Sequence, residues 1–158
     1  MTVRLLKARA RVQDADFQLM ALALNRTRSQ HPFYLTAWVF LPDHWPAICA
    51  PIYPRTISLV MKSFKNSSTI LIIRRRAERG ESWQPRFFNR ALRTVLEYRE
   101  KVESIHLNPV RAGLAKRAEE WPWSSVREYS GTLQDEATRH PILPLDRVLL
   151  PSDERTRI

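Results

Sequence analysis

The chain has 158 residues, 44% of them hydrophobic, and its 26 Lys and Arg against 16 Asp and Glu give a formal charge of +10. A chain of this size buries enough apolar surface to fold as one domain, which argues against intrinsic disorder. The single cysteine, Cys49, excludes an internal disulfide framework. No apolar run approaches the roughly 20 residues that cross a bilayer, so we expect a cytoplasmic protein without a membrane span.

The first part of the chain predicts a helix followed by two paired strands. After a short strand at residues 3–6, residues 14–30 place apolar side chains at near-helical spacing, and Asp14 is a favourable capping residue. Residues 33–41 are aromatic and β-branched, and a second apolar run extends to Ala50. A proline and an aspartate separate the two runs and favour a tight turn between adjacent strands.

The second part predicts two more helices and a looped segment between them. Residues 54–77 begin with a proline, which suits a helix start, and repeat apolar residues on one stripe. Residues 78–92 mix glycine, proline, aromatic residues and arginines, which is typical of a loop with a short strand. Residues 94–107 form an amphipathic pattern that ends at Asn108-Pro109.

This order of elements predicts an α+β fold. The predicted elements follow one another as strand, helix, strand, strand, helix, looped strand and helix. This order fits a ferredoxin-like, split βαβ arrangement, with an antiparallel sheet and helices on one face. We expect residues 1–130 to form one domain. Residues 131–158 are interrupted by prolines and predict a poorly ordered tail.

The positive charge is concentrated in the middle of the chain. Residues 55–117 carry 15 basic and 5 acidic groups, whereas residues 1–54 carry 6 and 3, and residues 118–158 carry 5 and 8. Such crowding is the electrostatic footprint of a protein that binds a polyanion, because each Lys or Arg that meets a phosphate releases a counterion. A generally basic, well-solvated surface explains the charge equally well.

His44 opens the second predicted strand. A strand directs residues two apart to the same side, so histidines at positions 44 and 46 would aim both imidazoles at one divalent metal ion. Position 46 is a proline. A single histidine at a strand end is more often a structural or surface residue than a ligand, so His44 alone does not define a metal site.

Ser104 and Asn108 lie four residues apart on the last predicted helix. This spacing puts both side chains on one helix face, where they could reach the same site. The residues also fit an ordinary helix end, in which Asn108 supports the turn, Pro109 blocks propagation and Gly113 permits a positive φ. The helix-end reading is the simpler one for this segment taken alone.

Three blocks of sequence resemble one known family. They read FYLTAWVFLPDHWPAI, then SWQPRFFNRALRTVLEYREKVESIHLNPVRAGL, then EEWPWSSVREY. In this order and spacing they resemble the REP-associated tyrosine transposases, bacterial members of the HUH superfamily of single-strand DNA nucleases. The resemblance spans about residues 15–130.

The resemblance implies a catalytic site that departs from the family pattern at two positions. In such proteins a His-hydrophobic-His motif and a polar residue from a later helix hold Mg²⁺ or Mn²⁺, and a helix tyrosine attacks a DNA phosphodiester. The implied metal ligands are His44 and Asn108, with Pro46 at the position of the second histidine. Ser104 stands at the position of the tyrosine.

Each departure has a physical cost. Pro46 offers no side-chain ligand, so metal affinity should fall. The hydroxyl of Ser104 ends several bonds short of a tyrosine phenol and is far less acidic, so covalent cleavage should fail or be very slow. Tyr98 lies about 120° around the helix from Ser104, which makes it a poor substitute.

The implied partner is single-stranded or hairpin DNA, bound by a monomer or a homodimer, with no role for a membrane. Stacking on unpaired bases would use Trp83, Phe87 or Trp45, although core packing is the more common role of such residues. The side chains expected to meet phosphates are basic. They are Lys62, Arg74, Arg75, Arg76, Arg86 and Arg90.

Two other functions are open from the sequence. The protein could be an active, metal-dependent single-strand endonuclease in which His106 or a water replaces the tyrosine. It could instead be a nucleic-acid-binding regulator that uses the same basic surface and performs no chemistry.

Overall fold

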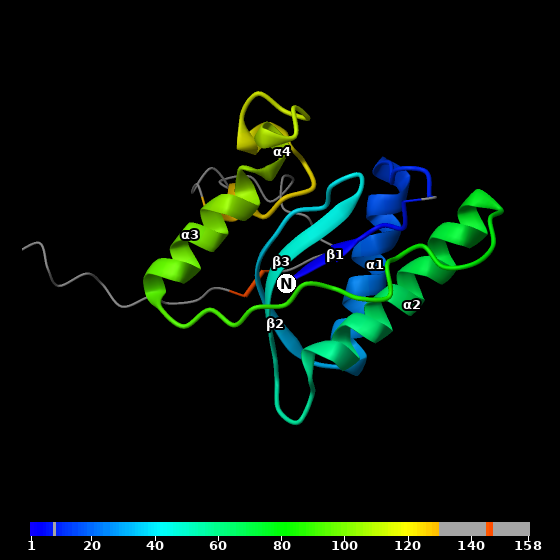
Figure 1. Ribbon diagram of the computed structural model, residues 1–158, viewed down its shortest axis with the longest axis horizontal. Helices are drawn as coiled ribbons and strands as arrows, with labels where there is room; N and C mark the ends of the chain where they lie inside the picture. Colours follow the sequence, from blue (N-terminus) through cyan, green and yellow to red (C-terminus); the bar gives the residue numbers. More distant parts are fainter. Residues whose placement is uncertain (8, 130–144, 147–158) are drawn as a thin grey trace, which may run out of the picture.

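The computed structural model describes residues 1–7, 9–129 and 145–146. Its centre is a three-stranded antiparallel sheet in the order β1-β3-β2 (Figure 1). The strands are β1 (Thr2–Arg4), β2 (Phe33–Trp38) and β3 (His44–Pro51). The two strands predicted on either side of the Pro42-Asp43 turn therefore pair as neighbours, and β1 joins the far side of β3.

A looped segment adds a fourth position to this sheet. Isolated antiparallel bridges pair Thr2 with Phe88 and Leu5 with Trp83, so residues 83–88 run beside the outer edge of β1. The resulting order, 83–88 then β1-β3-β2, is that of a split βαβ sheet. The predicted α+β class with its antiparallel sheet is confirmed.

Two long helices cover one face of the sheet. Helix α1 (Asp14–Gln30) has the predicted bounds, and α2 (Ile57–Arg76) packs beside it. Helix α2 begins at Ile57 rather than at Pro54, because the side chain of the preceding residue, Thr56, caps the helix by accepting the backbone N–H of Leu59 at 3.3 Å.

The main core lies between these helices and the sheet. It is rich in aromatic rings, which pack against one another with centroids 4.4 to 6.4 Å apart. Its fully buried aromatic side chains come from α1, β2, β3 and α2 and from the segment that joins β2 to β3. They include Phe17, Phe33, Trp38, Phe40, Trp45 and Phe64.

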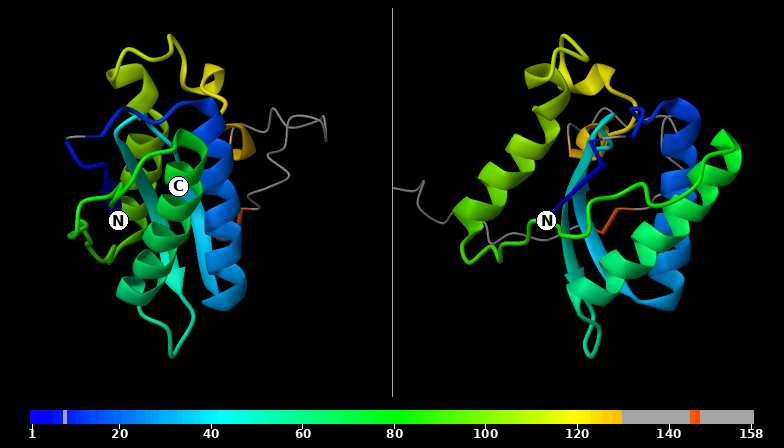
Figure 2. Two further views of the ribbon diagram at one scale, coloured as in Figure 1. Left: turned by 90° about the vertical axis from the view of Figure 1, so that its right-hand side faces the viewer. Right: turned by 45° about the vertical axis from the view of Figure 1, so that its right-hand side comes forward.

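Helix α3 (Val95–His106) lies on the opposite face of the sheet (Figures 1 and 2). Its buried Val102 and Ile105 form a second core cluster with Ala37, Val39 and Leu41. The expectation that the helices lie on one face is therefore wrong for α3. The second and third strands carry apolar side chains on both faces of the sheet. Each face therefore needs a helix to bury it, and α3 covers the face that α1 and α2 leave open.

Short helical segments complete the fold. Helix α4 (Asn108–Arg111) follows α3 directly, because the proline lies in its first turn, where a missing N–H costs nothing. The 3₁₀ helix η1 (Ala118–Glu120) and α5 (Val126–Tyr129) come next. Gly113 has the expected positive φ, 69°.

The predicted tail, residues 131–158, lies outside the described residues except for Leu145 and Asp146. Asp146 pairs with the free edge of β2: its backbone N–H donates to the Leu35 carbonyl at 2.8 Å, and its carboxylate accepts the Leu35 N–H at 2.7 Å. The boundary at residue 130 stays a prediction. In the part of the chain that the structure describes, no helix is long and apolar enough to cross a membrane.

Candidate nucleic-acid interface

His44 and Pro46 face the layer between the sheet and α3. Trp45 and Ala47 belong to the core on the other face, and side chains alternate along a strand. Ile48, the next residue in the same alternation, packs in the cluster with α3. Positions 44 and 46 therefore lie on the same side of β3, as the strand alternation predicted.

The imidazole of His44 is oriented by its neighbour Asp43. The Nδ1 atom of His44 lies 2.7 Å from Oδ1 of Asp43. Burial by itself opposes ionisation of Asp43, but the hydrogen bond and charge of His44 outweigh it, so the pKa of Asp43 is lowered. When Nδ1 donates to this carboxylate, Nε2 is the ring nitrogen left for another group.

Ser104 opens onto a pocket on the α3 side of the sheet. The pocket has a volume of about 860 Å³ and is bounded by β1, β3, α3 and the segment before α3. Its wall includes Thr2, Ile48, Phe88 and Lys101. The size lies within the range of roughly 300–1,000 Å³ that is common for ligand sites.

The pocket brings together some of the predicted site residues and leaves others outside. Ser104 lines it, and Ser104 Oγ accepts a weak hydrogen bond from Arg111 at 3.4 Å. Neither His44 nor Asn108 is part of its lining. Asn108 lies half-buried at the start of α4, one helical turn beyond Ser104.

These side chains do not fit a tightly held divalent metal ion. Among the described residues, no group of three or more His, Cys, Asp or Glu side chains could hold one. Pro46 is buried in β3 and has no ligand atom in its side chain. Mg²⁺ and Mn²⁺ favour several oxygen donors, and a site with His44 and an amide alone does not provide them. The transposase family as a class suggests dependence on a divalent metal, but the residues described in the structure do not present such a donor set.

The two residues considered as substitutes for a tyrosine at position 104 both make hydrogen bonds, and Tyr98 lines the same pocket as Ser104. The Tyr98 hydroxyl lies 3.0 Å from the hydroxyl of Tyr129, which in turn donates to the Thr36 carbonyl. His106 is 6% exposed, and its Nε2 lies 2.8 Å from Ser125 Oγ. Burial lowers the pKa of His106 to about 4, so this ring is a neutral core residue that does not line the Ser104 pocket.

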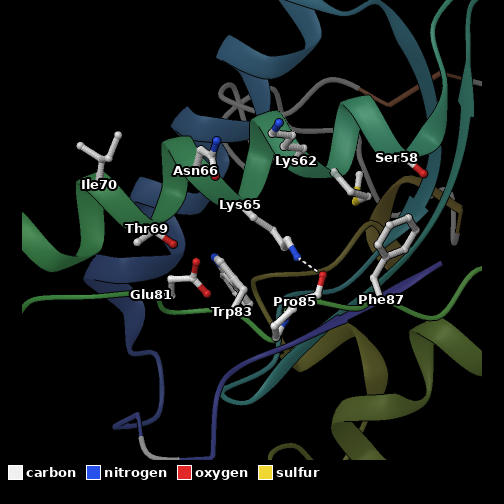
Figure 3. A pocket seen from close by; sticks show the side chains of 11 residues that line it. Ser58, Lys62, Lys65, Asn66, Thr69, Ile70, Glu81, Trp83, Pro85 and Phe87 are labelled. Atoms are coloured by element: carbon white, nitrogen blue, oxygen red, sulfur yellow. Dashed lines mark hydrogen bonds between the residues drawn. The ribbon is translucent and has the colours of Figure 1, made fainter.

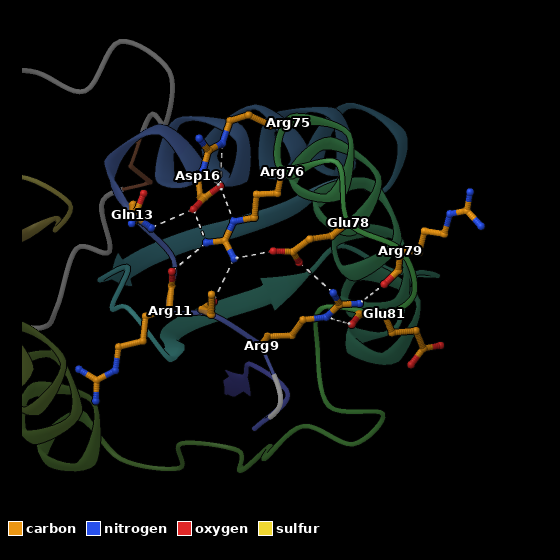
Figure 4. Close-up of polar contacts among 10 residues, drawn as sticks. Arg9, Arg11, Gln13, Asp16, Arg75, Arg76, Glu78, Arg79 and Glu81 are labelled. Atoms are coloured by element: carbon orange, nitrogen blue, oxygen red, sulfur yellow. Dashed lines mark hydrogen bonds and ion pairs between the residues drawn. The ribbon is translucent and has the colours of Figure 1, made fainter.

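Two of the predicted DNA-binding arginines have a structural role (Figure 4). Asp16 is completely buried and accepts hydrogen bonds from Arg75 at 2.7 Å and from Arg76 at 2.6 Å. Burial alone raises the pKa of Asp16, but bonds from Arg76, the Gln13 N–H and Arg75 outweigh it and lower the pKa. This cluster ties the end of α2 to the start of α1. Arg74 is exposed beside it.

The remaining predicted cations have exposed head groups. Lys62 lies on the outer face of α2 and lines a second pocket, of about 630 Å³, between α2 and residues 81–87 (Figure 3). Arg86 is exposed, and Arg90 pairs with Glu97 at 2.5 Å while staying 67% exposed. The predicted set is thus divided between the two faces of the sheet.

The aromatic residues considered for base stacking are core residues. Trp83 is 3% exposed and donates its Nε1 hydrogen to Ser68 Oγ at 2.8 Å. Trp45 is fully buried, and Phe87 packs against the same core. The indole faces of Trp83 and Trp45 are not available to DNA in this structure, so the assignment of Trp83 to DNA binding is not supported, whereas Phe87 is half-buried and lines the pocket beside α2.

Phe88 is an exposed aromatic residue beside Ser104 that the sequence did not single out. It is 65% exposed and lines the Ser104 pocket. The signal was present in the sequence: if Trp83 and Phe87 face the core in an extended segment, residues 84, 86 and 88 face the other way. Recognising it required knowing that residues 83–88 run beside a strand.

The fold and this surface define a basic, ferredoxin-like α+β domain with a pocket between its sheet and α3. No protein-family model matches the chain. It is 30% identical over 125 residues to a REP-associated tyrosine transposase of Escherichia coli (strain K12), covering 78% of this chain and 73% of that protein.

A solved structure is similar over nearly the whole chain. It is described as the REP-associated tyrosine transposase bound to a REP hairpin, with 28% sequence identity and a TM-score of 0.73, covering 96% of this chain and 86% of that one. The chain belongs to the REP-associated tyrosine transposases. The family resemblance drawn from the three sequence blocks is confirmed.

Proposed function

We propose that this protein binds structured single-stranded DNA, hairpins in particular, and that its strand cleavage is impaired. The observation that carries the binding proposal is the neighbour bound to a REP hairpin, which is similar over 96% of this chain. The DNA partner is consistent with the net charge of +10 and implies a cytoplasmic location.

The proposed loss of cleavage rests on the HUH-type site itself. Ser104 borders the pocket but ends in a short alkyl hydroxyl, which is a weaker acid than a phenol and reaches less far. Pro46 removes one of the two strand ligands, leaving His44 and Asn108 as the candidate remnants of the metal site. Both changes act on the chemistry and leave the basic surface in place.

The proposed phosphate contacts are Lys62, Arg74, Arg86 and Arg90. Their head groups are exposed, whereas Arg76 is committed to Asp16 and is only 11% exposed. Arg75 shares that carboxylate but is 37% exposed, so it can add to the positive potential. A DNA hairpin with an unpaired extension has enough phosphates to span more than one of these positions.

The test uses labelled hairpin oligonucleotides with Mn²⁺ and the intact protein. We expect a shift on binding and no covalent protein-DNA adduct after denaturation. An adduct formed by the wild-type protein would contradict the impaired-cleavage proposal. The paired substitutions Pro46→His and Ser104→Tyr restore the family residues, and we expect adduct formation only when both are present.

A non-catalytic regulator is the second candidate function, and the incomplete donor set favours it over an active nuclease. It predicts binding that weakens steeply with salt and yields no product. Metal-assisted hydrolysis without an adduct is the enzymatic alternative. Cleaved DNA that carries no protein would favour that alternative, although His106 is buried away from the pocket.

A further inference from the structure

Part of the sheet on the α3 side is open to solvent. Helix α3 packs on β2 and β3, but Arg4 of β1 and both Arg86 and Phe88 of the neighbouring segment are exposed. Val3 and Leu5 are buried in the main core, so the alternation along β1 directs Thr2 and Arg4 to the open side. The open side thus combines an exposed ring with two guanidinium groups.

The backbone of Phe88 is fixed even though its ring is exposed. Its N–H donates to the Thr2 carbonyl at 3.0 Å, and its carbonyl accepts the Thr2 N–H at 2.8 Å. The preceding residue, Phe87, turns to the opposite side and lines the pocket against α2 (Figure 3). Phe88 is therefore presented on a strand-like segment whose backbone is already ordered, which lowers the entropic cost of binding through its ring.

The charges around Phe88 suit a nucleic acid better than an apolar protein partner. Within the described part of the chain, neither Arg4 nor Arg86 makes a side-chain ion pair. Lys101 lines the same pocket as Phe88, and of the two carboxylates there, Glu97 is already paired with Arg90. Aromatic rings flanked by cations form the usual platform for unpaired nucleotides, because every base has a face that stacks.

We propose that Phe88 stacks on an unpaired base next to a DNA hairpin and so directs the adjoining phosphate into the pocket of Ser104 and Lys101. This inference rests on the proposed hairpin binding and adds the residue that reads the single-stranded extension. Arg4 and Arg86 contact the flanking phosphates. The position of Phe88 on the pocket wall links base stacking to the phosphate site.

The test compares Phe88→Ala, Phe88→Trp and the control Tyr53→Ala in the full chain. Tyr53 is 93% exposed and lines neither the Ser104 pocket nor the Lys62 pocket. The probes are a blunt DNA hairpin and the same hairpin with an unpaired extension that carries 2-aminopurine. Binding is measured by anisotropy, and stacking by the quenching of 2-aminopurine fluorescence.

We expect Phe88→Ala to weaken binding of the extended hairpin about 5- to 100-fold, as removal of one stacking ring does. It should abolish the quenching and change blunt-hairpin binding less than about twofold. Phe88→Trp should retain both signals, as should Tyr53→Ala. Unchanged quenching in Phe88→Ala, or equal losses for both probes, overturns the inference.

The two proposals fail in different ways. If the wild-type protein binds neither hairpin better than a random duplex, the proposed function fails, and the stacking role with it. If the wild type binds hairpins but Phe88→Ala binds the extended one as well as the wild type does, only the role of Phe88 is wrong. Far-ultraviolet circular dichroism confirms that each variant is folded before binding is compared.

Discussion

The two faces of the sheet use similar residues for different purposes. On the α1 and α2 side, aromatic rings fill the core, and Arg75 and Arg76 neutralise the buried carboxylate of Asp16. On the α3 side, the ring of Phe88 is exposed, and the exposed Arg86 makes no ion pair among the residues that the structure describes. An arginine or an aromatic residue is therefore not evidence of DNA binding until its surroundings are known.

The largest expected effect contrasts the two aromatic residues of one segment. Trp83→Ala empties a buried site and leaves Ser68 without its indole partner, so we expect the free energy of unfolding to fall by about 3–5 kcal/mol. Phe88→Ala removes an exposed ring and should cost less than about 1 kcal/mol. Urea denaturation followed by circular dichroism measures both. Equal losses for the two variants would show that the faces do not differ in this way.

A second contrast concerns the charged groups. Asp16→Asn removes a buried carboxylate and leaves two arginines without it, so we expect a loss of about 3 kcal/mol in the free energy of unfolding. Arg74→Gln changes the exposed arginine next to Arg75, and its free energy of unfolding should stay within about 0.5 kcal/mol of the wild-type value. The same denaturation experiment applies. A stable Asp16→Asn protein would mean that the cluster is dispensable.

The third prediction uses the buried histidine under α3. The pKa of His106 is about 4 in the folded protein, against an ordinary value of 6.5. Between these values the unfolded chain binds more protons, so stability falls as the pH decreases from 6.5 towards 4 and this contribution levels off below 4. Between pH 7.5 and 4.5 we expect a loss of about 2 kcal/mol from this group.

His106→Gln is the matched variant for that measurement. It removes the titrating ring, and we expect its unfolding free energy to vary less with pH over the same interval than that of the wild type. Parallel pH curves for the two proteins would show that another group accounts for the loss.

The smallest expected effect, a change in the salt dependence of DNA binding, distinguishes the proposed phosphate contacts on the two faces of the sheet. Arg86→Gln on the open side should lower the slope of log affinity against log salt by about one unit for a hairpin with an unpaired extension. Lys62→Gln tests the outer face of α2 with the same probe. A slope that changes for Lys62→Gln but not for Arg86→Gln would place the DNA on the α2 side and contradict the comparison.

Much of the fold could be predicted because its signals are local. The helix at residues 14–30 follows from apolar spacing within the segment, and the pair of strands follows from the turn between them. The segment at residues 83–88 was harder, because its bridges to β1 join residues more than 75 positions apart in the chain. The side of the sheet on which α3 packs likewise depends on contacts with distant strands.

The candidate site shows the same division. The sequence predicts that Ser104 and Asn108 share a helix face and that positions 44 and 46 share a side of a strand. Both predictions concern residues within one element. Core packing was the more common expectation for Trp83, but its partner Ser68 and the burial of His106 against Ser125 could not be predicted, because they depend on other elements.

The sequence by itself determined the α+β class and the family, since these reside in local periodicity and in residue identity, and residue identity also predicts the two replaced catalytic positions. Only the tertiary structure decided which arginines hold Asp16, which aromatic rings form the core, and that Phe88 faces solvent beside Ser104. The physical reason is that exposure of a side chain is set by the segments that pack over it, and those segments are brought together only by folding.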